Sequence, residues 1–335
     1  MHMADALLAP AVAGTMYVAS AAAATYSVKK VRLENDIKKI PVMGVMSAFV
    51  FATQMINFTI PGTGSSGHLC GGLLLSILLG PYAGFLSMIS VLVIQCLLFA
   101  DGGLLALGSN IWNMAFYGCF VGYLLIYRPL ARKSMKTGFI VLASVLGSVI
   151  SLQLGAFSVT LETYLSGITA LSFGQFFILM QPIHLAIGTV EGLITAAVVI
   201  FVKNTRPELL ENNTAQNRIG LKQTLMILTS LVVLIGGGLS LAASSNPDGL
   251  EWSIQKITGN TEIEPENAYT DAVKSAEGIQ EKTAVLPDYA FKGSDSILGT
   301  SFSGIIGSIV VAAICTGIAV LFKFFKKRDH SKGKL

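Results

Sequence analysis

Residues 69–99 read LCGGLLLSILLGPYAGFLSMISVLVIQCLLF, a run without a single Asp, Glu, Lys or Arg. A helix needs about 20 apolar residues to cross a bilayer core of about 30 Å, so this run is too long for one comfortable crossing. It is broken at Gly80-Pro81, where a proline ends or kinks a helix. Because backbone groups in lipid must satisfy their own hydrogen bonds, the stretch predicts two membrane helices, 69–79 and 83–99.

The composition extends this interpretation to the whole chain. Of its 335 residues, 53% are hydrophobic and only 13% are charged, and the mean hydropathy is +0.67. These values exclude an ordinary soluble domain and are typical of an all-α, polytopic helical membrane protein. The four cysteines lie in apolar segments at irregular spacing, which favours small buried side chains over disulfides or a thiolate metal site.

The distribution of charge predicts the topology. Most lysines and arginines fall in four clusters, within residues 29–39, 128–136, 203–222 and 323–334, which the positive-inside rule places in the cytoplasm. The segment 243–298 holds ten acidic residues and four lysines, a net charge of −6, and should lie outside. No basic stretch precedes the first apolar segment, so no secretory signal is evident and the N-terminus is expected outside.

Nine crossings agree with an outer N-terminus and a cytoplasmic C-terminus. They are predicted at 7–28, 40–60, 69–79, 83–99, 104–127, 138–160, 172–202, 222–243 and 299–322. A change in composition divides the chain into a seven-span part, 1–203, a polar cytoplasmic linker, 204–221, and a two-span part, 222–335, whose outer loop 243–298 is soluble. No internal repeat is visible, which weakens the hypothesis of a secondary transporter built from inverted repeats.

The N-terminal Met1-His2 predicts a metal chelate. The α-amine, the amide nitrogen of residue 2 and the His2 imidazole can bind one ion in a plane, closing a five-membered and a six-membered ring. Square-planar nitrogen ligation favours Ni(II) or Cu(II). His2 is large, so we expect Met1 and its amine to be retained. The alternative is a chance histidine on a frayed terminus.

A Gly/Ser-rich stretch, PGTGSSGHLCGG at 61–72, lies on the same predicted side as Met1. Glycines permit tight turns, and Ser and Thr side chains stiffen such loops, so the stretch could aim His68 at a fixed point as a fourth nitrogen ligand. The alternative is a plain connector with a solvent-facing histidine. No G-x-x-x-x-G-K-S/T pattern occurs, so the chain carries no visible nucleotide site.

Four further polar residues could support such a site. His184 and Glu191 are seven residues apart and share a helical face in the span 172–202, either as a second metal or proton site or as a hydrogen-bonded pair that fixes helix packing. Asp5 is near enough to the terminus to orient the His2 ring, as carboxylates often do beside metal sites. Asn110 lies near the outer end of its span and could brace a site there.

These residues resemble a known family of metal transport components. Met1-His2, the loop GSSGHL at 64–69 and QPIHL at 181–185 with Glu191 are similar to the CbiM/NikM family, the substrate-specific components of energy-coupling-factor transporters for cobalt and nickel. The resemblance covers about residues 1–203. NPDGLEW at 246–252 resembles the PDGLE motif of the companion N component, in a NikMN-like fusion.

The resemblance implies a seven-helix metal-binding component in which the Met1 amine, the His2 amide and imidazole and the His68 imidazole bind the ion. His184 and Glu191 match the family pattern without an assigned ligand role. The sequence departs from the pattern after residue 2, where it reads MADA at 3–6. The chelate needs only the first two residues, so the departure concerns the path of the chain behind them.

The function predicted from these observations is metal capture for a transition-metal importer, with Ni2+ or Co2+ as the transported substrate. The chain is expected to be a non-enzymatic, multi-pass component of the cell membrane, in contact with lipid and not with nucleic acid. Its expected partners, as the family implies, are two cytosolic ATPase subunits and a transmembrane coupling subunit. The alternatives are a secondary ion-coupled divalent-metal permease with His184 and Glu191 as a proton relay, a membrane metalloenzyme using His68 and His184, and a purely structural subunit.

Overall fold

The computed structural model describes residues 1–31, 39–167, 171–210, 219–263, 270–294, 296 and 298–332. The longer helices are α1 (Pro10–Lys30), α2 (Lys39–Gln54), α4 (Pro81–Phe99), the π-helix Ile111–Tyr127, α7 (Thr137–Ser166), α8 (Phe173–Thr205), α9 (Leu221–Gly237) and α12 (Leu298–Lys332). The shorter helices are α3 (Gly72–Leu79), α5 (Leu107–Asn110), α6 (Arg128–Lys133), α10 (Gly249–Thr258) and α11 (Thr270–Thr283), and the π-helix joins α5 to α6. The described strands, β1 (Phe58–Ile60) and β2 (Ser65–Gly67), form one antiparallel hairpin. The all-α membrane fold predicted from the sequence is confirmed.

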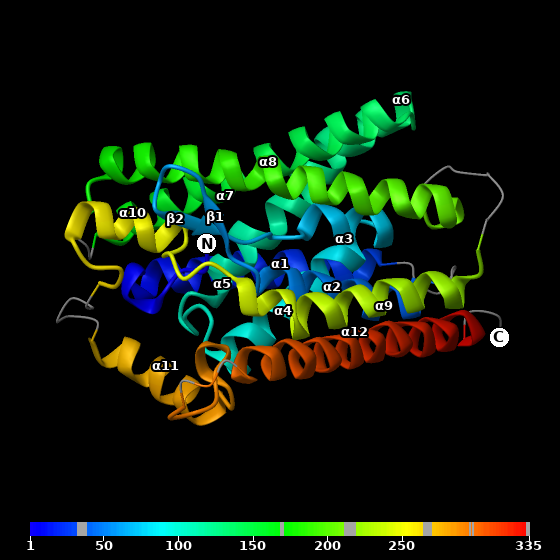
Figure 1. Cartoon of the computed structure of the whole chain (residues 1–335). Coiled ribbons are helices and arrows are strands. Elements are labelled where there is room, and N and C mark those ends of the chain that lie inside the picture. Colours follow the sequence, from blue (N-terminus) through cyan, green and yellow to red (C-terminus); the bar gives the residue numbers. More distant parts are fainter. Residues whose placement is uncertain are drawn as a thin grey trace.

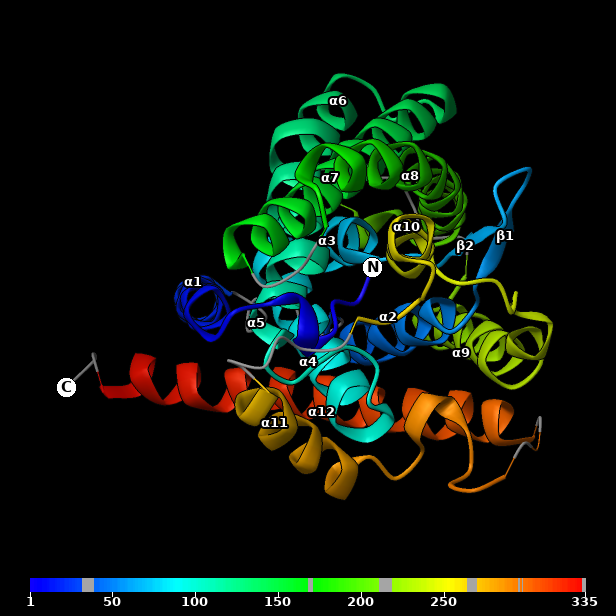
Figure 2. The same ribbon diagram turned by 90° about the vertical axis from the view of Figure 1, so that its left-hand side faces the viewer.

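Most of the long helices run side by side and form a bundle with two different ends, and α12 crosses one side of it obliquely (Figures 1 and 2). The hairpin, α10 and α11 lie at one end, and α6 and the C-terminus lie at the other. Figure 2 looks along the bundle from the end that carries α10 and α11, and places the N-terminus near the centre, among α2, α3, α4 and α10. The terminal residues therefore lie inside the bundle instead of fraying from it.

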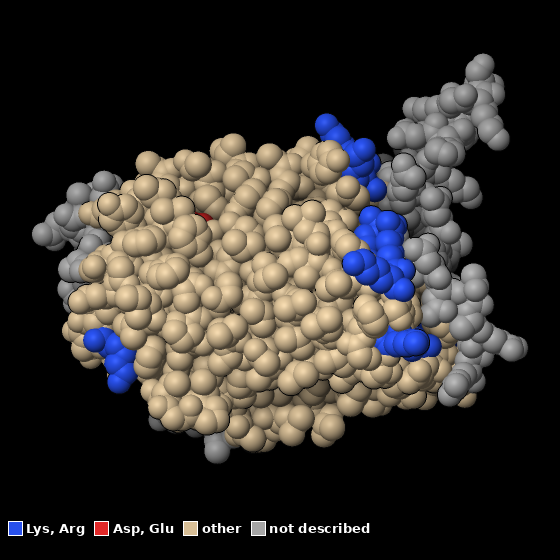
Figure 3. All heavy atoms as spheres, turned by 90° about the horizontal axis from the view of Figure 1, so that it is seen from above, with Lys and Arg blue, Asp and Glu red and all other residues tan. Residues whose placement is uncertain are grey.

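The outer face of the bundle is apolar over most of its length. Figure 3 shows lysine and arginine side chains gathered mainly at the end opposite α10 and α11, with an almost uncharged face between the ends. Large exposed apolar side chains come from several long helices, including Leu142, Ile178, Leu193, Leu234, Ile309 and Leu321. A wide apolar surface of this kind is what lipid requires, and it fits a multi-pass membrane protein.

Among the described residues, six helices are long and apolar enough to cross a membrane. They are Pro81–Phe99, Leu107–Lys133, Thr137–Ser166, Phe173–Thr205, Leu221–Ala242 and Leu298–Phe324. The prediction of nine crossings is therefore not confirmed. The first two predicted spans correspond to helices α1 and α2, which are not among the six, and α2 is a shorter apolar helix.

The segment predicted to cross at 69–79 is instead an internal helix. α3 has eight residues, all of them buried, and rises only about 12 Å, well short of a bilayer core. Gly80, at φ 88°, adopts a left-handed conformation that glycine tolerates, and Pro81 then begins α4. The break predicted at Gly80-Pro81 is confirmed. It separates the short buried helix α3 from α4, which is long enough to cross a membrane.

Glycines allow the main helix pairs to approach closely. In α8, Gly188 and Gly192 face the backbone of α7, where a β-carbon on Gly188 would lie 2.8 Å from the Cα atom of Val149. In α9 and α12, Gly236 and Gly304 face each other in the same way. Such small-residue pairs are typical of membrane helix packing.

The predicted linker and outer loop are only partly described. Residues 207–209 form a single helical turn, and residues 211–218 of the linker lie outside the described residues. The same holds for residues 264–269, 295 and 297 of the outer loop. The described part of this loop contains α10 and α11, so it is not an unstructured spacer.

Candidate metal centre

The first three residues lie within the bundle, packed against its helices. Met1 is 4% exposed and Met3 is fully buried. The Asn110 side chain brackets the backbone of Met3, since its Oδ1 accepts from the Met3 N–H at 2.7 Å and its Nδ2 donates to the Met3 carbonyl at 3.2 Å. The Gly103 N–H donates to the same carbonyl at 2.9 Å. Asn110 thus fixes the terminal segment by its backbone, as a bracing residue would.

Asp5 tethers the terminal segment to the turn that follows α4. Its Oδ1 accepts a hydrogen bond from the Ala106 N–H at 2.9 Å, and Gly103 packs so closely against the Asp5 carboxylate that a β-carbon there would overlap it. The contact with the His2 ring, which we expected from Asp5, is made by Asp101 instead. The reason is the short helical turn Asp5–Leu7, which carries the Asp5 side chain toward residues 103–106.

The loop that carries His68 is held from two helices. The Glu191 carboxylate accepts from the Cys70 N–H at 2.6 Å and from the Gly71 N–H at 3.1 Å, and the Gln54 Nε2 donates to the Cys70 carbonyl at 2.7 Å. Glu191 therefore positions the histidine loop, and the His184 ring has a different partner. Carboxylates that accept two backbone N–H groups are strong, directional anchors.

The His68 ring presents one nitrogen to the N-terminus. Its Nδ1 donates to the Leu69 carbonyl at 3.0 Å, because a carbonyl oxygen can only accept, and this leaves a lone pair on Nε2. Nε2 lies 3.2 Å from the Met1 nitrogen. Burial, followed by the nearby Met1 ammonium charge, lowers the pKa of His68 to about 3, so the ring is neutral at physiological pH.

The His2 ring stacks on the His68 ring, with centroids 5.1 Å apart and planes at 24°. Its Nδ1, the nitrogen that would close the six-membered chelate ring, lies 3.2 Å from the Asp101 Oδ1. Its Nε2 lies 3.3 Å from the Gln95 Oε1. The imidazole is thus held by two residues that flank the end of α4.

The Met1 ammonium has a second buried partner, Asp248, with 2.6 Å between the nitrogen and Oδ2. Burial is the largest single effect on the Met1 amine and lowers its pKa, but the charge and the hydrogen bond of Asp248, with smaller contributions from other neighbours, together raise that pKa. Burial likewise raises the pKa of the Asp248 carboxyl, but the charge and the hydrogen bond of the ammonium, with other neighbouring groups, together bring it below its usual range. The two groups form an ion pair at the centre of the site.

Asp248 and Asp101 are absent from the site residues predicted from the sequence. No pattern singles out Asp101, which follows α4 as an ordinary polar residue. Asp248 belongs to the motif at 246–252. This motif is the feature of the sequence from which a place for Asp248 in the site could have been predicted. What the sequence could not indicate is that residues 247 positions apart meet here.

His184 lies beside this site without joining it. Its Nδ1 donates to the Met180 carbonyl at 2.8 Å, one turn earlier in α8, and its Nε2 is buried without a hydrogen-bond partner among the described residues. The pairing of His184 with Glu191, which was one of two predictions, is not formed, since both side chains have other partners.

The arrangement brings three predicted ligand residues together in a buried space. Metal–nitrogen bonds of about 2 Å place adjacent corners of a square plane about 2.8 Å apart, close to the 3.2 Å between the Met1 nitrogen and His68 Nε2. Within the described part of the chain, no three or more His, Cys, Asp and Glu side chains gather in a metal-binding group. The predicted nitrogen set is of a different kind, because it includes the amine of Met1 and the amide of His2, which are main-chain atoms.

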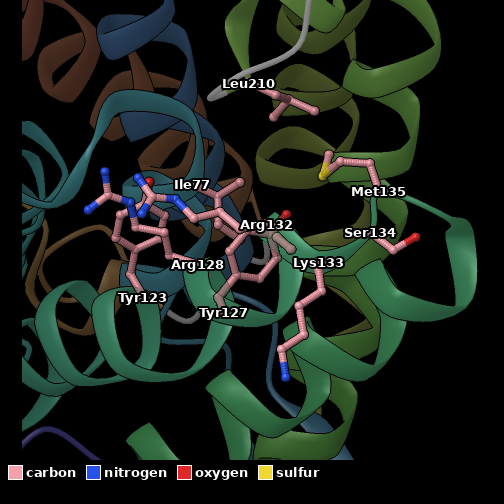
Figure 4. Close-up of a pocket in the computed structure, with 10 residues that line it drawn as sticks. Ile77, Tyr123, Tyr127, Arg128, Arg132, Lys133, Ser134, Met135 and Leu210 are labelled. Carbon is pink, nitrogen blue, oxygen red and sulfur yellow. The ribbon is translucent and has the colours of Figure 1, made fainter.

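A separate pocket lies at the basic end of the bundle (Figure 4). It is lined by aromatic and basic side chains, among them Tyr123, Tyr127, Arg128, Arg132 and Lys133. It shares no lining residue with the cluster around Met1. Its charge suits the cytoplasmic end of a membrane protein, where basic residues concentrate.

The fold and the buried nitrogen cluster define a polytopic membrane protein with a candidate site for a transition-metal ion. Residues 2–209 match the family model described as the cobalt uptake substrate-specific transmembrane region, CbiM, and the chain belongs to that family. Residues 222–324 match the PDGLE domain.

Two relatives match nearly the whole chain. A protein of Archaeoglobus fulgidus that carries the name fused nickel transport protein NikMN is 35% identical over 318 residues, 94% of this chain and 96% of the relative. A protein of Lactiplantibacillus plantarum named fused nickel transport protein LarMN is 31% identical over 335 residues, 95% of this chain and 97% of the relative. A crystal structure of a truncated transition metal transporter is 36% identical, with a TM-score of 0.53, over 60% of this chain and 98% of that chain.

Proposed function

We propose that the chain captures Ni(II) for an ATP-driven importer, with Co(II) as the second candidate substrate. The ligands are the Met1 amine, the His2 amide and Nδ1, and the His68 Nε2. The observation that carries this proposal is the 3.2 Å approach of the Met1 nitrogen to His68 Nε2 inside the bundle. Four nitrogens in a plane favour Ni(II) among the available divalent ions, and the named relatives are nickel transport proteins.

Binding requires three changes at the site. The Met1 ammonium and the His2 amide each lose a proton, because only the deprotonated nitrogens can coordinate. The His2 Nδ1, which donates to the Asp101 carboxylate, loses its proton while Nε2 gains one that the Gln95 Oε1 can accept, and Nδ1 then exchanges Asp101 for the ion. The ion gives up its water shell in return. The two protons lost from the Met1 ammonium and the His2 amide carry away two positive charges. The site therefore has the same net charge before and after the divalent ion binds.

The division of the chain follows from the same proposal. Residues 1–203 hold the ligands, 204–221 connect on the cytoplasmic side, and 222–335 add two helices and the outer loop. The site lies at the end with α10 and α11, away from the basic end (Figures 1 and 3). With that end outside and the C-terminus in the cytoplasm, capture takes place on the outer face. Transport then depends on two cytosolic ATPase subunits and a transmembrane coupling subunit.

The direct test displaces the amine without removing a side chain. Three extra glycines before Met1 should abolish tight Ni(II) binding by the purified full chain, as measured by calorimetry and by the absorption of planar nickel; a single glycine is unsuitable, because it would place the histidine third in the chain and create a new amine–amide–imidazole chelate. The matched control carries the three glycines after Leu335 and should bind like the unmodified chain. Tight nickel binding by the N-terminally extended variant would refute the chelate.

A second test addresses the energy source. Cells that express the chain with its partner subunits should lose nickel uptake when ATP is depleted while the ion gradients are clamped. Uptake that follows the proton gradient and ignores ATP would instead identify a secondary permease.

A further inference from the structure

The motif at 246–252 is docked on the hairpin that leads to His68. The Ser66 N–H donates to the Pro247 carbonyl at 2.8 Å, and the Ser66 hydroxyl donates to the Asn246 carbonyl at 2.7 Å. The Trp252 indole N–H donates to the Thr63 carbonyl at 3.0 Å. Figures 1 and 2 show α10 beside β2 as a result. Hydrogen bonds thus join two segments that lie almost 200 residues apart in the sequence.

The next residues bring this segment against α8. A β-carbon on Gly249 would lie 2.7 Å from Ile183 Cγ2 and 3.1 Å from His184 Cε1, so only glycine fits without a shift. Leu250 is 2% exposed and belongs to the same hydrophobic core as Ile183. These contacts leave the segment little freedom to slide along the hairpin.

Asp248 uses its two carboxylate oxygens for different purposes. Oδ1 caps α10 and accepts from the Leu250 N–H at 2.7 Å and the Glu251 N–H at 2.9 Å. Oδ2 lies 2.6 Å from the Met1 nitrogen. The cap fixes the carboxylate plane, so the oxygen that meets Met1 is held by a helix that is itself docked.

We infer that Asp248 is a positioning residue for the metal site: it holds the Met1 nitrogen beside His68 and neutralises the loaded site. This inference rests on the proposed function. A divalent ion bound by one deprotonated amide and three neutral nitrogens leaves a single positive charge in a buried space. The fixed carboxylate supplies the matching negative charge, and it can accept a hydrogen bond from the metal-bound amine.

The inference assigns a role to the second part of the chain. The last segment of the binding site comes from the PDGLE domain, while the ligands all come from residues 1–68. Metal capture therefore depends on the docking of the two parts and not on the first part alone.

The test separates the charge of Asp248 from its helix cap. Asp248→Asn and Asp248→Ser keep a capping oxygen and lose the charge, while Asp248→Glu keeps the charge and is a poor cap. Glu251→Gln is the matched control, because it removes one carboxylate from the same helix end without contacting Met1. Nickel affinity is measured by calorimetry on each purified full-length variant, together with the planar nickel absorption at saturation.

Asp248→Asn and Asp248→Ser should bind nickel roughly 10- to 100-fold more weakly, the usual loss for a residue that supports a metal ligand. Asp248→Glu should bind more tightly than either, and Glu251→Gln should bind like the unmodified chain. At saturation the absorption should be unchanged in all four, because Asp248 is not a ligand.

Two results would overturn the inference while leaving the proposed function intact. One is normal affinity in Asp248→Asn while the three-glycine extension before Met1 still abolishes binding. The other is the reverse order, with Asp248→Glu weakest, which would make the helix cap the only role. Unchanged binding in the N-terminally extended chain would instead refute the proposed function itself.

Discussion

At the scale of single residues, the candidate site depends on how its nitrogens are held. The His68 tautomer is set by the Leu69 carbonyl, and its loop is anchored by Glu191 and Gln54. The Met1 nitrogen is held by Asp248, and the Met3 backbone by Asn110. Each proposed donor residue thus has a neighbour that fixes it, which lowers the cost of ordering the site around an ion.

The pH dependence of nickel binding follows from these surroundings. The pKa of the Met1 amine is raised by Asp248, so the proton that the metal must displace is held to higher pH. Affinity should therefore fall as pH falls, by about tenfold per pH unit for each displaced proton. We expect at least a hundredfold difference between pH 6 and pH 8, measured by calorimetry.

His68 provides the control for this prediction. Its pKa is lowered to about 3, first by burial, so the ring does not titrate between pH 6 and 8. His68→Ala should bind nickel more weakly at every pH with the same slope against pH. An affinity that does not change with pH would contradict coordination by the amine and the amide.

The close approach of Gly103 to Asp5 gives a second prediction at this scale. A β-carbon at residue 103 would overlap the Asp5 carboxylate and lie 2.5 Å from the Asp5 nitrogen. Gly103→Ala should push the terminal segment out of place and weaken nickel binding about tenfold or more, as loss of ligand support does. Gly14→Ala is the control, because nothing lies within 4 Å of that position. Equal binding by the two variants would show that the terminal path does not matter.

At the scale of elements, the two parts of the chain are joined by helices that pack through small residues. Gly236 of α9 and Gly304 of α12 bring their backbones together, and α12 also lies against α2, where Gly44 faces Thr316. α2 in turn packs against α3, the short, fully buried helix that also lies against α4. The outer helices of the second part therefore brace the elements that carry the His68 loop.

The contact between α9 and α12 can be tested with one methyl group. Gly304→Ala would place its β-carbon against the Gly236 carbonyl and should destabilise the protein by about 1–3 kcal/mol, the usual cost of overpacking. Gly317→Ala, in the same helix with nothing within 4 Å, should leave stability unchanged. Thermal unfolding in detergent measures both. An equal unfolding temperature for the two variants would mean that this contact carries little stability.

At the scale of the whole molecule, the two ends of the bundle differ in charge and in content. One end carries α10, α11 and the nitrogen cluster, and the other carries most of the basic side chains and the pocket of Figure 4. The positive-inside rule predicts from this difference that the nitrogen cluster faces the outer side, the orientation that we propose.

Thiol labelling in intact cells tests this orientation. The native cysteines are all buried, so they should give little background. Asn260→Cys, at the exposed end of α10, should react with a membrane-impermeant maleimide, while Thr137→Cys at the basic end should react only after permeabilisation. The opposite pattern would reverse the proposed direction of capture.

The sequence allowed the helical membrane fold, the break at Gly80-Pro81 and the grouping of Met1, His2 and His68 to be predicted, the last with the help of family resemblance. Apolar length and proline chemistry are local properties, so they can be read directly. Burial of α3 is not local, because an internal half-helix is as apolar as a short crossing. The contacts of Asp101 and Asp248 depend on tertiary folding, which no spacing along the chain encodes.

The ion pair between Met1 and Asp248 also constrains how the protein is made. The carboxylate partner of Met1 is synthesised 247 residues after it, roughly 10 to 50 seconds later at ordinary elongation rates. During that interval the amine has no carboxylate to meet, and the bundle around it is incomplete. On the proposed function, a nascent chain should thus remain unable to retain nickel at full affinity until residue 248 has been made and has docked.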